Sequence, residues 1–210
     1  MDIQKTIENL RKNNFNVVLA ENKDEALNKV LAIIPTGSLC SSGGSVTLSE
    51  VGIIEALKNG NYRYIDRLDK TLSENDRMMT HFCDYFLMSS NAITENGELY
   101  NVDGNGNRIA ALIAGPKNVI VVSGINKIVK NLNEAVIRVK TTAAPLNAKR
   151  LSCDTYCAKF GKCVSLSKDS PEVTDGCGSK SRICSQYLVS GKQRNAGRIT
   201  IVLVNETLGY

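Results

Sequence analysis

NVIVVSG, residues 118–124, is a strongly apolar run of strand length, and a helix is predicted to follow it at about 130–138. Similar apolar runs recur along the chain and are predicted as strands, at 15–20, 38–42, 62–66, 84–90 and 198–206. Helical apolar spacing lies between them, at about 3–11, 22–34, 47–60 and 73–82. This alternation predicts an α/β domain with a mostly parallel sheet that is covered by helices on both faces.

Residues 93–115, ITENGELYNVDGNGNRIAALIAG, differ from this pattern. Asn-Gly turn signals at 96–97 and in DGNGN (103–107) predict an antiparallel excursion from the parallel sheet. No internal repeat or flexible linker divides the chain. We therefore predict one domain over residues 1–210, with residues 152–190 as a cysteine-rich insertion before the last strand.

Composition restricts the class of protein. The chain has 210 residues, 42% hydrophobic and 22% charged, which is typical of a globular domain. No apolar run approaches the roughly 20 residues that a membrane-spanning helix needs. The first residues, MDIQKTIENLRKN, lack the continuous apolar core of a signal peptide, so we expect a cytoplasmic protein without a membrane partner.

Five of the seven cysteines lie between residues 153 and 184, three of them in CDTYCAKFGKC (153–163). Disulfides rarely persist in a reducing compartment, and an odd number of cysteines cannot all pair. Thiolates are soft ligands that select zinc or iron–sulfur clusters. Only Cys153 and Cys157 have the short spacing of a zinc knuckle, whereas iron–sulfur clusters accept more varied spacing. A cluster is therefore favoured over zinc and over free thiols, and Cys40 and Cys83 are predicted to be core residues.

The positive charge of the chain is concentrated around these cysteines. The net charge is +5, and residues 151–198 contribute eight basic and four acidic side chains, hence +4. A metal or cluster bound by four thiolates keeps about two negative charges, which nearby Lys and Arg would offset. A solvated basic surface is the alternative interpretation. Few aromatic residues and no known motif accompany the charge, so no nucleic-acid partner is expected.

A glycine loop in SSGGSVTLSE (41–50) is the second chemical signal. Gly43 and Gly44 would let backbone N–H groups approach an anion at the start of a helix, with further hydrogen bonds from Ser45 and Thr47. A tight turn with Thr47 as the N-cap explains the same residues equally well. Glu50 follows one turn later and could be a general base or a plain first-turn carboxylate.

Polar residues after two other predicted strands converge on the same edge of the sheet. Glu95 follows the strand at 84–90, and Lys127 follows the strand at 118–124. In open α/β sheets, ligands bind beyond the carboxyl ends of the strands. Arg108 could clamp a substrate carboxylate or pair with Asp103, and Asn107 could bind the ligand or supply a turn conformation. We therefore predict one pocket for a small anionic substrate, with Glu50, Glu95 and Arg108 as catalytic candidates.

Several of these stretches resemble the lactate-utilisation (LUD) domain family. They are GGSVTLSEVGI (43–53), NGELYNVDGNGNRIAALIAGPKNVIVVSGINKIV (96–129), APLNAKRL (144–151) and RITIVLVNETLGY (198–210). The resemblance implies a three-layer α/β/α fold of the isomerase and CoA-transferase-like type. It also implies a role in the oxidation of L-lactate to pyruvate beside iron–sulfur partner proteins.

The cysteines are similar to the C-terminal motif of some family members, C-x5-C-x2-C-x6-C. Cys157 and Cys163 match the first pair, and Cys177 and Cys184 match the second. This chain departs from the motif by inserting VSLSKDSPEVTDG before Cys177 and by adding Cys153. The resemblance implies a [4Fe–4S] cluster on the four matching cysteines, with Cys153 as an alternate or fifth thiol.

Three functions agree with these residues. The favoured one is redox-associated handling of a small 2-hydroxy or 2-oxo acid with an iron–sulfur cluster. The second is a non-redox isomerase or transferase-like enzyme with a structural zinc. The third is a non-catalytic subunit that docks onto iron–sulfur partners. The sequence leaves the substrate and the oligomeric state, a homo-oligomer included, undecided.

Overall fold

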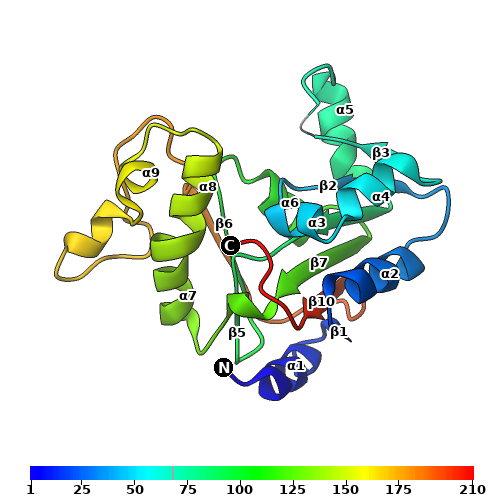
Figure 1. Ribbon diagram of the computed structural model, residues 1–210, viewed down its shortest axis with the longest axis horizontal. Coiled ribbons are helices and arrows are strands. Elements are labelled where there is room, and N and C mark those ends of the chain that lie inside the picture. The colour runs from blue at the N-terminus through cyan, green and yellow to red at the C-terminus, as the bar shows by residue number, and fades with distance from the viewer. Residues whose placement is uncertain (68) are drawn as a thin grey trace.

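The computed structural model describes residues 1–67 and 69–210, and a six-stranded sheet runs through its centre (Figure 1). The strand order is β1-β10-β7-β4-β2-β3, and all neighbouring strands are parallel. The strands are β1 (Asn16–Ala20), β2 (Leu39–Ser42), β3 (Arg63–Ile65), β4 (Tyr85–Met88), β7 (Asn118–Gly124) and β10 (Ile199–Val204). The apolar run at 118–124 is confirmed as a strand, and it lies in the interior of the sheet between β10 and β4.

Alternate side chains of β7 pack into two different cores, as the pleat of a strand requires. Val119 and Val121 belong to one buried cluster, which includes residues of α1 (Ile3–Lys12) and α6 (Asn107–Ala114). Ile120 and Val122 belong to a second cluster on the opposite face. That face is covered by α2 (Lys23–Ile33), α3 (Val46–Glu50) and α4 (Ile53–Asn59). The predicted three-layer α/β/α fold is therefore confirmed.

Local signals explain where the helices begin and end. Asn22 caps α2 by accepting a hydrogen bond from the Glu25 amide at 2.9 Å. The helix predicted at 47–60 is instead two helices, because Gly52 adopts φ +81° between α3 and α4. The helix predicted at 73–82 is α5 (Glu74–Met79) followed by a 3₁₀ turn, η1 (Thr80–Phe82).

A second, four-stranded sheet has the order β8-β5-β6-β9. Its strands are β5 (Ala92–Thr94), β6 (Leu99–Asp103), β8 (Ile128–Val129) and β9 (Gln186–Ser190). The antiparallel excursion is confirmed by the β5–β6 hairpin, which turns at Asn96-Gly97. The second turn signal, DGNGN, leads into α6 rather than into another strand.

The cysteine-rich segment is ordered by its attachment to the rest of the domain. It follows α7 (Leu132–Arg138), a π-helical turn, η3 (Val139–Ala143), and α8 (Ala144–Arg150). The segment contains α9 (Tyr156–Phe160), a 3₁₀ turn, η4 (Val164–Ser167), and β9, which pairs antiparallel with β6. The Cys163 amide donates to the Lys140 carbonyl at 2.8 Å. The pairing of β9 was not anticipated, and it makes the end of the insertion part of a sheet. None of the helices that the structure describes is long and apolar enough to cross a membrane.

We expect Gly97→Ala to destabilise the domain more than Gly37→Ala does. Both glycines have positive φ, +81° and +82°, so alanine costs about 1–2 kcal/mol of backbone strain at either site. At Gly97 a Cβ would also lie 2.5 Å from the backbone carbonyl carbon of Asn9 in α1, whereas at Gly37 it meets nothing within 4 Å. Urea unfolding of both variants measures the difference. If both variants lose the same free energy of unfolding, the hairpin is not packed against α1.

Candidate functional site

A polar pocket lies beyond the carboxyl ends of β2, β4 and β7, the edge where parallel sheets bind ligands. We call it the polar pocket. Its charged side chains are mostly basic, since Asp103 is the one acid among the described residues that line it. The lining residues are 43–47, 67, 77, 86, 89–91, 102–108, 127, 147, 150, 151, 183 and 210.

The glycine loop lies in this pocket, but its first amide is already used. The Gly43 amide donates to the Leu87 carbonyl at 3.0 Å and so extends the pairing of β2 with β4. Ser45, rather than Thr47, caps α3, because its hydroxyl accepts from the Leu48 amide at 3.3 Å. Thr47 is buried and donates to the Leu208 carbonyl at 3.3 Å. Of the two glycines, only Gly44 therefore has an amide that is not part of this strand pairing.

The guanidinium of Arg108 lies under the pocket and forms hydrogen bonds with other groups of the protein. One terminal nitrogen donates to the Ser89 carbonyl at 2.8 Å and to Asn101 Oδ1 at 2.6 Å. The other donates to the Asn91 side chain, the Val102 carbonyl and Asp103 at 2.6–3.1 Å. These bonds occupy both terminal nitrogens, so the predicted bidentate clamp on a substrate is wrong for this conformation. The predicted pairing with Asp103 is present, but it is largely buried rather than on the surface.

Gly43 is required by the position of Arg108. A Cβ at this position would lie 3.1 Å from Cδ of Arg108, closer than side chains normally approach. The glycine thus accommodates the arginine stem as well as ending the strand.

Lys127 lies in the 3₁₀ turn η2 (Ile125–Lys127) after β7, and its side chain is almost fully buried. Its Nζ donates to Thr47 Oγ1 at 2.8 Å and to Ser89 Oγ at 3.0 Å. Burial lowers the pKa of Lys127 to about 7, and the nearby charges of Arg138 and Arg108 lower it in the same direction. The structure therefore brings Lys127 into the pocket with Thr47, as the sequence predicted.

The other candidates lie in different places. Asn107 is the first residue of α6, lines the pocket and is exposed. Glu50 does not line the pocket, and its carboxylate accepts from the Gly209 amide at 2.6 Å. Glu95 is also outside it. Its carboxylate accepts from Lys5 Nζ at 3.3 Å and from the Asp2 amide at 3.0 Å, so the expectation that Glu95 shares this pocket is wrong.

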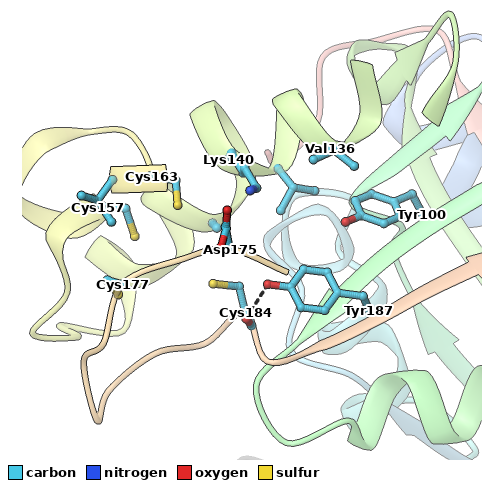
Figure 2. Close-up of a pocket in the computed structure, with 12 residues that line it drawn as sticks. Tyr100, Val136, Lys140, Cys157, Cys163, Asp175, Cys177, Cys184 and Tyr187 are labelled. Atoms are coloured by element: carbon cyan, nitrogen blue, oxygen red, sulfur yellow. Dashed lines mark hydrogen bonds between the residues drawn. The ribbon is translucent and has the colours of Figure 1, made fainter. Parts of the chain in front are cut away.

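A second pocket brings four cysteines together (Figure 2). Cys157, Cys163, Cys177 and Cys184 line it, and Cys157 and Cys163 are buried. We call it the cysteine pocket. All seven cysteines are free thiols, and Cys40 and Cys83 are buried in the two cores as predicted. Cys153 is not among the residues that line the pocket.

Each of three thiols in this pocket has a polar neighbour. Cys163 Sγ lies 3.2 Å from Ser165 Oγ, and Cys157 Sγ lies 3.4 Å from Thr155 Oγ1. Arg182 Nε donates to Cys184 Sγ at 3.3 Å. Lys140 also lines the pocket, where its Nζ donates to Ser165 Oγ at 2.9 Å. Basic and hydroxyl groups thus contact the sulfur atoms, while the carboxylate of Asp175 and apolar side chains also line the pocket.

The thiols oppose one another's ionisation. Burial raises the pKa of Cys157, and ionised Cys177, Cys184 and Cys163 would raise it further, while the Thr155 hydroxyl acts in the opposite direction. Four thiolates can therefore share this pocket only with a compensating positive charge. A metal centre supplies such a charge.

Four cysteine thiols line this pocket, and thiolates are the ligands that both zinc ions and iron–sulfur clusters use. Four thiolates around one zinc lie about 3.8 Å apart, given Zn–S distances of about 2.3 Å in a tetrahedron. Within the described residues, no three His, Cys, Asp or Glu side chains are gathered closely enough to hold one ion. In a [4Fe–4S] cluster each thiolate binds a different iron, so the four ligands surround a volume rather than a point. Figure 2 shows Asp175 among the four cysteines of the pocket and Cys184 beside Tyr187.

The two pockets share a wall. Ile183 lines the polar pocket, and Cys184, the next residue, lines the cysteine pocket. The Ser185 amide donates to the Asp103 carbonyl at 2.9 Å, which fixes this wall to the end of β6. A centre held by Cys184 would thus lie one residue away from the polar pocket.

Comparison with known proteins agrees with the fold. The sequence matches the family model described as the LUD domain over residues 3–204. A crystal structure of a DUF162 family protein from Deinococcus radiodurans has a similar fold, with a TM-score of 0.53 and 14% sequence identity. That similarity covers 96% of this chain and 94% of the other. A search of curated protein sequences found no significant match.

The fold and the family match define an α/β protein that is lactate-utilisation-like. The match spans nearly the whole chain, and the chain belongs to the LUD-domain family. The sequence analysis missed Lys140, Arg150 and Ser89 as pocket residues. Ser89 could have been found from its place at the end of the predicted strand at 84–90. The other two lie on η3 and α8, and their position depends on how this helical region packs.

We expect Lys127→Met to stabilise the domain relative to wild type most strongly at or below pH 7. A lowered pKa means that between about pH 7 and the ordinary value of 10.5 the unfolded chain binds more protons at Lys127 than the folded one. Wild-type stability should therefore rise with pH in this window, by up to about 1.4 kcal/mol per pH unit relative to the variant. Urea unfolding at pH 7, 8 and 9 measures the slope. A difference that does not change with pH would contradict the lowered pKa.

Proposed function

We propose that this protein handles a small 2-hydroxy or 2-oxo acid in the polar pocket, beside a [4Fe–4S] cluster held by Cys157, Cys163, Cys177 and Cys184. The observation that carries the proposal is the wall shared at Ile183 and Cys184. It joins a thiol-lined pocket to a basic pocket at the carboxyl edge of the sheet. Membership of the LUD-domain family supports the substrate class.

The cysteine pocket supports the cluster through its ligands and its surroundings. When bound, the cluster would supply one-electron chemistry or a Lewis-acidic iron. The protein would hold it with the four thiolates, and Arg182 and Lys140 would offset their negative charge. The Arg182 bond to Cys184 Sγ and the Ser165 contact with Cys163 Sγ would tune it, because hydrogen bonds to sulfur shift the potential of such centres.

The polar pocket supports an anionic substrate. Arg67, Arg77 and Arg150 line it. Arg77 already donates through both terminal nitrogens to the carbonyls of Arg67 and Asp69, and Arg67 donates to Thr80 Oγ1. Arg150 holds Asn147 and Tyr210 through Nε and Nη2, which leaves Nη1 available to a carboxylate. Lys127, Thr47 and Ser89 supply polar groups deeper in the pocket. We assign substrate positioning to Arg150 and proton handling to Lys127.

The experiments below can also reveal either of two other functions. If the cysteine pocket binds zinc, the metal would serve only to stabilise the cysteine-rich segment. That result would favour a non-redox isomerase or transferase. A protein that binds neither metal nor acid when isolated would favour a subunit that docks onto iron–sulfur partners. We place the protein in the cytoplasm because four reduced thiols in one pocket suit a reducing compartment.

Protein purified without oxygen should contain about four iron and four sulfide per chain. Replacing any one of Cys157, Cys163, Cys177 or Cys184 with alanine should remove most of this iron, because each thiolate holds its own iron atom. Cys153→Ala is the matched control and should keep it, since Cys153 lies outside the pocket. Elemental analysis measures the iron, sulfide and zinc content per chain in each variant. About one zinc without sulfide, or equal iron in the Cys184→Ala variant, would refute the cluster.

The isolated protein should bind pyruvate or L-lactate with an affinity that depends on Arg150. We expect Arg150→Gln to weaken binding roughly tenfold, the usual contribution of one charge-assisted hydrogen bond. Arg194→Gln provides the control, because Arg194 is exposed and lies outside the pocket. Isothermal titration calorimetry measures both. Equal affinities in the two variants would remove the polar pocket as the substrate site.

A further inference from the structure

The hydrogen bonds of Lys127 differ from those of most buried lysines. The side chain is only 2% exposed, and its Nζ donates hydrogen bonds to two partners among the described residues, Thr47 Oγ1 and Ser89 Oγ. Thr47 gives its own proton to the Leu208 carbonyl, and Ser89 gives its proton to the Ser90 carbonyl at 3.5 Å. Both hydroxyl oxygens are therefore acceptors for Lys127.

Two acceptors match the two N–H groups of a neutral amine. An ammonium would carry a third N–H, and the described residues offer it no further acceptor. No carboxylate lies within ion-pairing distance of Nζ in the described part of the chain. A neutral amine leaves its lone pair free of protein donors. The depressed pKa described above agrees with this state near neutral pH.

The surroundings of Lys127 are those of a nucleophilic lysine rather than of a structural one. Buried lysines that serve structure alone are expected to pair with carboxylates or to bond carbonyl groups. Lys140, the other buried lysine, does so in part, because it donates to the Glu172 carbonyl at 2.6 Å. Lys127 instead lines the basic pocket and is held only by hydroxyl groups. Desolvated lysines of this kind are the ones that act as nucleophiles towards carbonyl groups.

We infer that Lys127 is a carbonyl-reactive lysine, whose amine forms a reversible imine with the 2-oxo group of an anionic acid bound in the polar pocket. This inference rests on the proposed function for its substrate class. The Nζ lone pair attacks the carbonyl carbon, and one proton passes from the amine nitrogen to the carbonyl oxygen to give a carbinolamine. Loss of water then forms the C=N bond. The reaction needs no oxidant or reductant, and the released water balances it.

Thr47 and Ser89 act as positioning residues in this step. Their oxygens hold the two N–H groups, which directs the lone pair away from them. The basic side chains of the pocket would hold the carboxylate of the acid and keep its carbonyl near Nζ. The glycine at position 209 allows this packing, since a Cβ there would lie 2.5 Å from Thr47 Oγ1.

Borohydride trapping with pyruvate tests the imine. Sodium borohydride reduces an imine to a stable secondary amine, so the adduct can be mapped by peptide mass spectrometry. We expect one adduct per chain, on Lys127, in the wild type and in Lys117→Arg. Lys117 precedes the opposite end of β7 and is exposed, which makes it the matched control. Lys127→Arg and Lys127→Met should form no adduct at this site. No adduct in the wild type, or the same adduct yield in both Lys127 variants, overturns the inference.

Two further measurements separate this inference from the proposed function. Calorimetry with pyruvate and iron analysis are run on the same preparations. Pyruvate binding without a trapped adduct would overturn the imine while the proposed function stands. Formaldehyde with borohydride tests the amine without any acid substrate. We expect Lys127 to be methylated at pH 7 at least tenfold faster than Lys117, because about half of its amine is neutral there. Equal or slower methylation would overturn the reactive lysine even if pyruvate does not bind.

Discussion

The guanidinium of Arg108 joins the parts of this molecule that a parallel sheet alone would leave separate. It bonds the chain just after β4, the side chains of Asn91 and Asn101, and Asp103 at the end of β6. The parallel sheet and the second sheet are thereby fixed to each other beneath the polar pocket. A charged group this well buried is stable only because its terminal nitrogens are satisfied. Removal of Arg108 would leave Asp103 and several carbonyls without their donor.

The same network positions both pockets. Asp103 accepts from Arg108 and from the Ile109 amide, which sets the start of α6 at the rim of the polar pocket. The carbonyl of Asp103 accepts from the Ser185 amide, which draws the cysteine-rich segment against β6. Because β9 continues this pairing, Ile183 and Cys184 lie between the two pockets. The geometry of the cysteine pocket therefore depends on contacts far from it in sequence.

Long-range packing also gives the two buried lysines different roles. Lys127 lies in the turn η2 after β7 and contacts α3 and the loop after β4. Lys140 lies in a π-helical turn between α7 and α8, a feature that often marks functional sites. One faces hydroxyl groups in a basic pocket, and the other faces thiols and a carbonyl. Similar side chains thus acquire different chemistry from their surroundings.

The sequence by itself determined the α/β class, the strand at 118–124, the hairpin at 96–97 and the cysteines that could bind a metal. Apolar periodicity and turn residues act over a few positions, so these features are readable locally. Only the tertiary structure decided which charged residues share a pocket. Glu95 bonds to Lys5 of α1, the terminal nitrogens of Arg108 are used inside the protein, and Cys153 does not line the pocket of the other four thiols of its segment. Side-chain partners are set by strand order and by loops that meet from distant parts of the chain, which local spacing does not encode.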